Sequence, residues 1–186
     1  RRALTIAEQT QGPDHPIVGT YLNNLALLLV EKGDLEAAEP MYRRALEIRE
    51  KALGPNHPST GSSLNNLAGL LSTKGDLEAA EPLYRRALEI IEQVQGPNHP
   101  STGTSLNNLA LFLAEKGDLE AAEPLSRRAL EITEKAQGPN HPSTGTSLNT
   151  LALLLKSKGD YKAAEPLYRR ALEIAEQAHG PNHPST

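Results

Sequence analysis

Histidine is the residue type in this sequence with the widest chemical use, and five of its six copies follow one another at intervals of 42 residues. A neutral imidazole binds metal ions and acts as a general base near neutral pH. Packed helices lie about 8 to 10 Å apart, so equivalent residues two helices further along are separated by roughly 20 Å, too far to share one metal ion. Each of the five directly precedes a proline, which predicts a role in linkers or helix caps: His15, His57, His99, His141 and His183.

Asparagine is the second candidate, because its amide offers two donors and an acceptor and can pair with the N–H and C=O of a bound peptide. It recurs every 42 residues, with threonine in the fourth copy: Asn24, Asn66, Asn108 and Thr150. Three residues further on, apolar or small residues are the expected source of selectivity for a ligand: Leu27, Gly69, Leu111 and Leu153. These residues are the predicted peptide-binding groove. The alternative is that the asparagines are merely solvated and recur because the repeats were copied.

Other catalytic and metal-binding patterns are absent from the sequence. It has no cysteine, no phosphate-binding glycine loop, no paired-histidine metalloprotease motif and no nucleophile-elbow motif. His179 and His183 are close in sequence, but Gly180 and Pro181 interrupt any helical pairing between them. We therefore predict a protein that is not an enzyme and that binds no metal ion or cofactor.

Composition and charge narrow the class of partner. The formal net charge is -4, from 23 acidic and 19 basic residues that are interspersed along the chain, and this disfavours nucleic-acid binding. The longest apolar run, Leu25 to Val30, has six residues, which is too short to span a membrane. The lack of cysteine fits a reducing compartment. We expect a cytoplasmic protein whose partner is a protein or peptide.

The whole chain is built from one repeated unit, and the helices of this unit must position the candidate binding residues. The segment from Gly54 to Gln95 recurs as Gly96 to Gln137 with 33 of its 42 positions identical. In each unit, leucine and alanine recur at three- and four-residue intervals over two stretches, the pattern of two amphipathic helices. Gly75 ends the first helix, and the side chain of Asp76 can cap the second. The predicted helices are Pro16–Lys32, Leu35–Leu53, Pro58–Lys74, Leu77–Gln95, Pro100–Lys116, Leu119–Gln137, Pro142–Lys158 and Tyr161–His179.

The predicted domain organisation is a single array over residues 1–186. It consists of a partial second helix (1–11), four repeats (12–53, 54–95, 96–137 and 138–179) and the start of a further repeat (180–186). An isolated helix pair of this length leaves apolar surface exposed, so each pair must stack on its neighbours. The expected fold is all-α: a solenoid of antiparallel helix pairs.

Two further expectations concern packing. The asparagines that precede the groove positions lie on the flank of each first helix, where we expect them to bond between neighbouring helices: Asn23, Asn65, Asn107 and Asn149. The third repeat departs from the others in one core position, where Ser126 stands in place of Tyr42, Tyr84 and Tyr168. Looser packing is expected in that layer.

The unit resembles the tetratricopeptide repeat, on the residues Leu64-Asn65-Asn66-Leu67-Ala68, Gly75-Asp76-Leu77, Ala80, Tyr84 and Ala87-Leu88. Its length and its G-P-x-H-P linker are similar to those of the 42-residue repeats of kinesin light chain. HEAT and armadillo arrays have similar periods and are the alternative fold, but they lack this Gly-Asp turn. The resemblance implies a right-handed superhelical solenoid in which the first helix of each pair lines a concave surface. It also implies that Asn24, Asn66 and Asn108 contact cargo peptides, while Thr150 departs from it. No lysine or arginine takes an inner position, so a ligand clamped by its terminal carboxylate is not expected.

The predicted function is that of a protein-interaction scaffold that holds an extended peptide or a partner helix in the groove of the first helices. One alternative is a structural spacer or self-assembling solenoid, whose uncapped terminal repeats stack end to end. Another is a regulatory segment of a larger multidomain protein.

Overall fold

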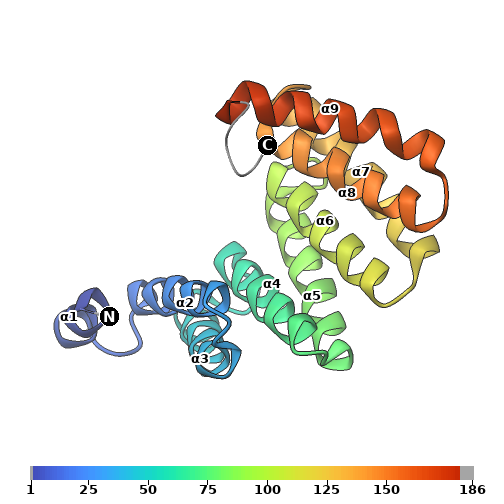
Figure 1. Ribbon diagram of the computed structural model, residues 1–186. Helices are drawn as coiled ribbons and strands as arrows, with labels where there is room; N and C mark the ends of the chain where they lie inside the picture. The colour runs from blue at the N-terminus through green and yellow to red at the C-terminus, as the bar shows by residue number, and fades with distance from the viewer. Residues whose placement is uncertain (1, 181–186) are drawn as a thin grey trace. The chain divides into compact units, whose positions relative to one another are not determined.

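The computed structural model describes residues 2–180, and all regular structure in this part of the chain is helical (Figure 1). A short helix, α1 (Arg2–Gln11), is followed by pairs in which a 16-residue helix precedes a 19-residue helix. The first helices are α2 (Pro16–Glu31), α4 (Pro58–Thr73), α6 (Pro100–Glu115) and α8 (Pro142–Ser157). The second helices are α3 (Leu35–Leu53), α5 (Leu77–Gln95), α7 (Leu119–Gln137) and α9 (Tyr161–His179). The all-α class and the helix-pair packing predicted from the sequence are confirmed.

The turn inside each pair forms where glycine and aspartate follow one another. In the second pair, Gly75 has a positive φ of 84°, and the N–H of Asp76 donates to the carbonyl of Leu71 at 2.9 Å. The Asp76 carboxylate then accepts a hydrogen bond from the N–H of Ala79 at 3.2 Å. The first contact closes α4 and the second caps α5, so the otherwise unpaired backbone groups at both helix ends find partners. The observed helices match the predicted ones, except that the lysine expected as the last helical residue, such as Lys74, is the C-cap.

Glycines inside the first helices let the two helices of a pair approach closely. A Cβ atom added at Gly61 in α4 would lie 3.2 Å from the side chain of Ile91 and 3.4 Å from the carbonyl oxygen of Ala87 in α5. Gly103 and Gly145 have the same tight surroundings in their pairs. Sequence reasoning missed this role, although the signal was present: glycine is costly inside a helix unless its lack of a side chain is used.

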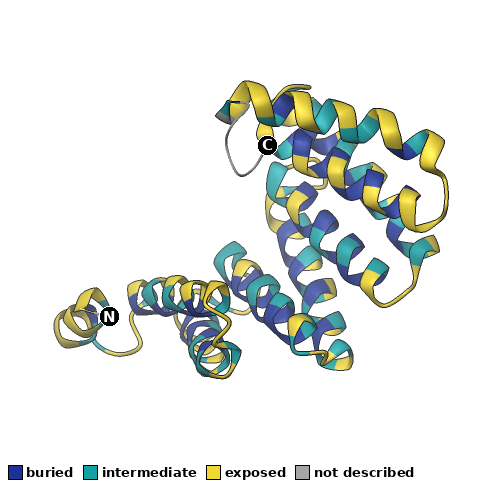
Figure 2. Ribbon diagram, viewed as in Figure 1, coloured by how far each residue is buried: buried dark blue, intermediate teal, exposed yellow. Residues whose placement is uncertain are grey.

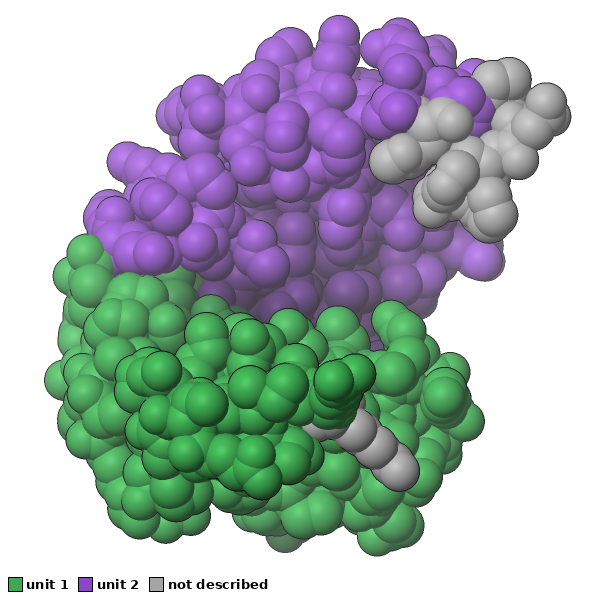
Figure 3. Space-filling model, turned by 90° about the vertical axis from the view of Figure 1, so that its left-hand side faces the viewer, with its two compact units in different colours: residues 1–94 green, residues 95–186 purple. Residues whose placement is uncertain are grey.

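The chain divides into two compact units, residues 1–94 and 95–186, which Figure 3 distinguishes by colour. In the first unit α3 packs against both α2 and α4, and α2 also touches α4. Its core contains two groups of buried side chains, one around Val18, Leu22 and Ile48 and the other around Leu64 and Ile90. In Figure 2 the buried residues of this unit, in dark blue, recur along the helices between exposed ones. Each helix pair thus covers its apolar faces with the next one, as the periodicity requires.

The second unit repeats the same arrangement. Here α7 packs against both α6 and α8, α8 packs against α9, and α6 touches α8. Leu151, Ala152 and Leu155 of α8 form a buried group with Ala164 of α9. The division of the chain into one array with the repeat boundaries given above stays a prediction.

In the core of the third pair, Phe112 as well as Ser126 differs from the residue that the other pairs share. Ser126 in α7 is fully buried, and its hydroxyl oxygen has no hydrogen-bond partner among the described residues. In the same pair Phe112 of α6 occupies the position of Leu28, Leu70 and Leu154, and it is also fully buried. A larger residue on α6 therefore accompanies the smaller one on α7.

Ion pairs join successive helix pairs on the outer surface of each unit. In the first unit, the ammonium of Lys74 lies 2.8 Å from Glu36 and 2.6 Å from Glu39, and Arg86 lies 2.8 Å from Glu50. The second unit has the equivalent contacts from Lys158 to Glu120 and Glu123 and from Arg170 to Glu134. Other ion pairs lie within one helix, such as Arg85 with Glu81 four residues earlier. The cross-repeat pairs fix which end of one pair meets the next.

These ion pairs predict a loss of stability in acid. The hydrogen bond from Lys74, followed by that from Arg43, lowers the pKa of the Glu39 carboxyl below 4.5, and Lys158 and Arg127 do the same for Glu123. A carboxyl with a depressed pKa in the folded state contributes stability above its unfolded pKa and loses it as the pH falls through the folded one. The melting temperature should therefore fall as the pH drops below 4.5.

The matched test is the double variant Glu39→Gln and Glu123→Gln, followed by thermal unfolding from neutral to acid pH. The melting temperature of the variant should be lower than that of the parent chain at neutral pH. The two melting temperatures should become equal as the pH falls. Added salt should narrow the difference at neutral pH, because the groups are partly solvated. Parallel curves at every pH would show that the two carboxylates do not carry the acid sensitivity.

Candidate functional site

The predicted binding residues of the first unit lie together on α2 and α4. Asn24 and Leu27 of α2 are exposed, the leucine by 48%, while Asn66 and Gly69 of α4 are half-buried. Because α3 packs on the other side of both helices, these residues form one surface, which we call the α2–α4 face. It also includes Thr20 and Glu31 of α2 and Ser62 and Thr73 of α4, all exposed.

The second unit has an equivalent surface, which we call the α6–α8 face, but one of the residues predicted to lie on it is buried. Asn108 and Leu111 of α6 are half-buried and Leu153 of α8 is 39% exposed, so these residues are available on the surface. Thr150 was predicted to line the groove and is only 3% exposed; its hydroxyl donates to the carbonyl of Thr146 at 3.1 Å. The helical wheel gave the direction of this side chain from its own helix, but the packing against neighbouring helices decided its burial.

Most hydroxyl groups on the two faces are already used as donors. Each donates to the carbonyl of the proline four residues earlier, at 3.2 to 3.4 Å: Thr20, Ser62, Thr104 and Thr146. They can still accept hydrogen bonds, but they have no proton left to donate. The asparagine amides are therefore the groups on these faces that can donate and accept at once.

The flanking asparagines connect neighbouring first helices, as predicted for Asn23 and Asn107. The amide of Asn66 donates to the side-chain oxygen of Asn23 at 3.0 Å, and the amide of Asn107 donates to the hydroxyl of Ser147 at 2.7 Å. Asn149 differs from this prediction, because it is exposed. The bond to Asn23 uses one donor of Asn66, a predicted ligand contact, and holds its amide in a fixed direction.

One buried charge was not singled out from the sequence. Arg49 of α3 is 8% exposed, and its guanidinium donates to the carbonyl of Ser59 at 3.0 Å and to the hydroxyl of Ser63 at 2.8 Å. Burial lowers the pKa of this guanidinium. The equivalent residues in the other pairs are Ile91, Thr133 and Ala175. This arginine ties α3 to the first turn of α4, and no other pair has a charged residue at its position.

The recurring histidines are helix caps. In each described linker the Nδ1 atom of the histidine accepts a hydrogen bond from the N–H two residues later, at 3.1 to 3.2 Å: His15, His57, His99 and His141. This confirms the predicted capping role. His183, and with it the pair with His179, lies outside the described residues. Within the described part of the chain, no three side chains of histidine, aspartate or glutamate are grouped so as to hold a metal ion.

Each of the two faces combines exposed leucine with amide groups, a chemistry suited to apolar contact and to main-chain hydrogen bonding. Among the described helices, none has both the length and the apolar character needed to cross a membrane.

This chain is similar to known repeat proteins both in sequence and in structure. The family model of the tetratricopeptide repeat matches residues 1–51, 31–93, 60–135 and 101–177. Among solved structures, BtubC (BKLC) from P. vanneervenii has a TM-score of 0.75 at 25% identity, covering 91% of this chain and 68% of that one. A comparison with curated proteins gives no match.

Two related crystal structures come from a putative kinesin light chain of Podospora anserina, described as nearly identical repeats of tetratricopeptide type. The TM-score is 0.74 for one of them, a variant with a single substitution, and 0.71 for the other. In both comparisons the sequence identity is 24%, and 84% of the solved chain is covered. They cover 95% and 96% of this chain and support its fold. Repeats of this type are generally non-enzymatic and mediate contacts between proteins. Because the family model matches overlapping segments over nearly the whole chain, the protein belongs to the tetratricopeptide repeat family.

Proposed function

We propose that the protein is a non-enzymatic interaction scaffold that binds an extended peptide or a partner helix on the α2–α4 face, on the α6–α8 face, or on both. The observation that carries this proposal is the exposure of leucine on these faces, 48% for Leu27 and 39% for Leu153, beside asparagine amides. Apolar side chains exposed beside polar groups that can orient a ligand are typical of recognition surfaces. Family membership supports the same function.

The roles of the residues follow from their chemistry. Asn24 and Asn108 can each pair with an N–H and a C=O of a bound main chain, which holds a peptide without regard to its sequence. The leucines would select partners with apolar side chains. Gly69 leaves room on the α2–α4 face, where a Cβ would meet only the hydroxyl of Tyr84, at 3.4 Å.

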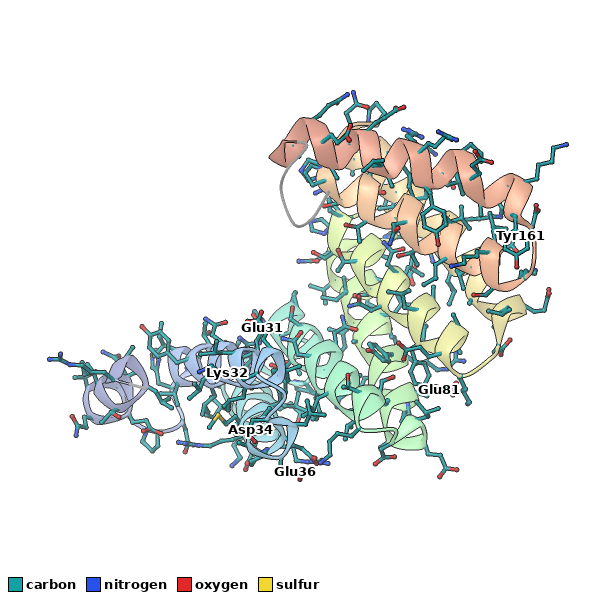
Figure 4. The ribbon with its side chains drawn as sticks, in the orientation of Figure 1. Glu31, Lys32, Asp34, Glu36, Glu81 and Tyr161 are labelled. Carbon is teal, nitrogen blue, oxygen red and sulfur yellow. The ribbon has the colours of Figure 1, made fainter. Side chains whose placement is uncertain are left out.

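Self-association is a second candidate, favoured by apolar surface away from the two faces. An open hollow of about 400 Å³ between α1 and α2 is lined by residues that include Ile6, Ile17 and Tyr21. Tyr161, at the start of α9, is 67% exposed (Figure 4). A chain that uses these surfaces would act as a spacer or a self-assembling rod.

The test of the first candidate is selection of binders from a phage-displayed library of random peptides, followed by fluorescence titration of a selected synthetic peptide. Asn24→Ala or Asn108→Ala should weaken binding about three- to tenfold, which corresponds to one or two lost hydrogen bonds. Asn56→Ala removes an exposed linker amide and is the matched control. If no peptide is selected while light scattering shows size growing with concentration, self-association is the better account.

A further inference from the structure

Glu31 is the one charged group among the described residues that define the α2–α4 face. It is the last residue of α2 and is exposed, and no described cation pairs with its carboxylate. The neighbouring acidic groups are already used: Asp34 caps α3 through the N–H of Ala37, and Glu36 pairs with Lys74. Figure 4 shows Glu31 on the opposite side of the turn from Asp34 and Glu36. The face therefore carries a free negative charge at one end.

The charge of Glu31 acts on the interior beneath the face. Tyr42 of α3 is buried, and its pKa is raised first by burial and then by the Glu31 carboxylate. Glu31 and the phenol of Tyr42 are thus close enough to interact across the packing of α2 on α3.

The apolar part of the face lies one helical turn away. Leu27 precedes Glu31 by four residues, so the two side chains are on the same side of α2 and about 5 to 6 Å apart. On α4, Gly69 occupies the position equivalent to Leu27 and contributes no side chain. The face therefore has no side chain on α4 at the position that Leu27 occupies on α2.

We propose that the α2–α4 face selects a partner segment that carries a bulky apolar residue for Leu27 and a lysine or arginine for Glu31. In an extended peptide, residues two apart point to the same side and lie about 6.6 Å from each other, which matches the spacing of the two side chains. Lys32, which follows Glu31, is the C-cap of α2, and the equivalent Lys74 of α4 turns to Glu36 and Glu39 of α3. The residues that define the face include no lysine or arginine, so a cation of the partner would meet the Glu31 carboxylate there. The inference rests on the proposed function and specifies the chemistry of its partner.

The experiment uses the same random-peptide selection on the complete chain. Peptides that depend on Asn24 should be enriched in lysine or arginine two positions from a bulky apolar residue. For one synthetic peptide of this kind, Glu31→Gln should weaken binding about two- to fivefold, and the effect should vanish when the basic residue of the peptide is replaced by norleucine. Glu47→Gln, which removes one carboxylate from the outer surface of α3, is the control with the same change in net charge.

The charge-reversal variant Glu31→Lys gives a second readout, because it should shift the selected peptides from basic to acidic. Selected peptides that bind through Asn24 but lack a basic residue, or equal affinities for Glu31→Gln and Glu47→Gln, would overturn the inference and leave the scaffold function intact. Failure to select any peptide would overturn both.

Discussion

Gly61→Val should destabilise the first unit by about 2 to 4 kcal/mol, whereas Gly69→Ala in the same helix should stabilise it by up to about 1 kcal/mol. The valine side chain at position 61 would overlap Ile91, which lies 3.2 Å from the site of the added Cβ, and would press on the carbonyl of Ala87. Position 69 is open apart from one contact at 3.4 Å with the Tyr84 hydroxyl. There the gain in helix propensity acts alone.

The measurement is chemical unfolding followed by circular dichroism, with both variants compared with the parent chain. Gly19→Val is an informative intermediate, because its closest contact is 3.4 Å and its cost should be smaller. Equal stabilities for Gly61→Val and Gly69→Ala would show that the close approach of α4 and α5 does not depend on glycine.

Ser126→Tyr should destabilise the second unit by about 2 to 3 kcal/mol on its own and become tolerated when combined with Phe112→Leu. In the second pair, the hydroxyl of Tyr84 in α5 lies 3.4 Å from the site of a Cβ added at Gly69, the residue of α4 that precedes Leu70. Phe112 stands in the position of that leucine and fills space that a tyrosine at position 126 would need. The double variant recreates the combination found in the other pairs.

Phe112→Leu alone should cost about 1 to 2 kcal/mol, because it leaves a cavity beside the small Ser126 side chain. A double-mutant cycle in thermal or chemical unfolding then gives the coupling between the two positions, which should exceed about 2 kcal/mol. Leu111 is not expected to cause the clash. The first and fourth pairs also have leucine at the position of Leu111, and both have tyrosine, Tyr42 and Tyr168, at the position of Ser126. Additive effects would show that the two positions pack independently.

Much of the fold could be predicted because its determinants are local. Helix ends depend on short sequences in which each residue acts on its own backbone: histidine before proline starts a first helix, and glycine followed by aspartate ends it and caps the second. The predicted boundaries differ from the observed ones by the single C-cap lysine, such as Lys74. The cap contacts of His57 and Asp76 follow from the same local reasoning.

The candidate site could be predicted only in part. Asn24, Leu27 and Leu153 are exposed as expected from their direction on the helix, but Thr150 is buried. A helical wheel describes one helix in isolation, and burial also depends on the helices packed beside it. A bond from Asn23 to a neighbouring helix was expected, but its partner, Asn66, was not identified, since the two residues are 43 positions apart.

The sequence alone determined the helices, their caps, the repeat period and the identity of the residues on each face, since these depend on neighbours along the chain. Only the tertiary structure decided the ion pairs from Lys74 and Lys158, the burial of Arg49 and the free carboxylate of Glu31 among the described residues. Each of these depends on distances between side chains from different helices. Such distances are set by how closely the helices pack, which glycines such as Gly61 allow, and a one-dimensional pattern does not contain them.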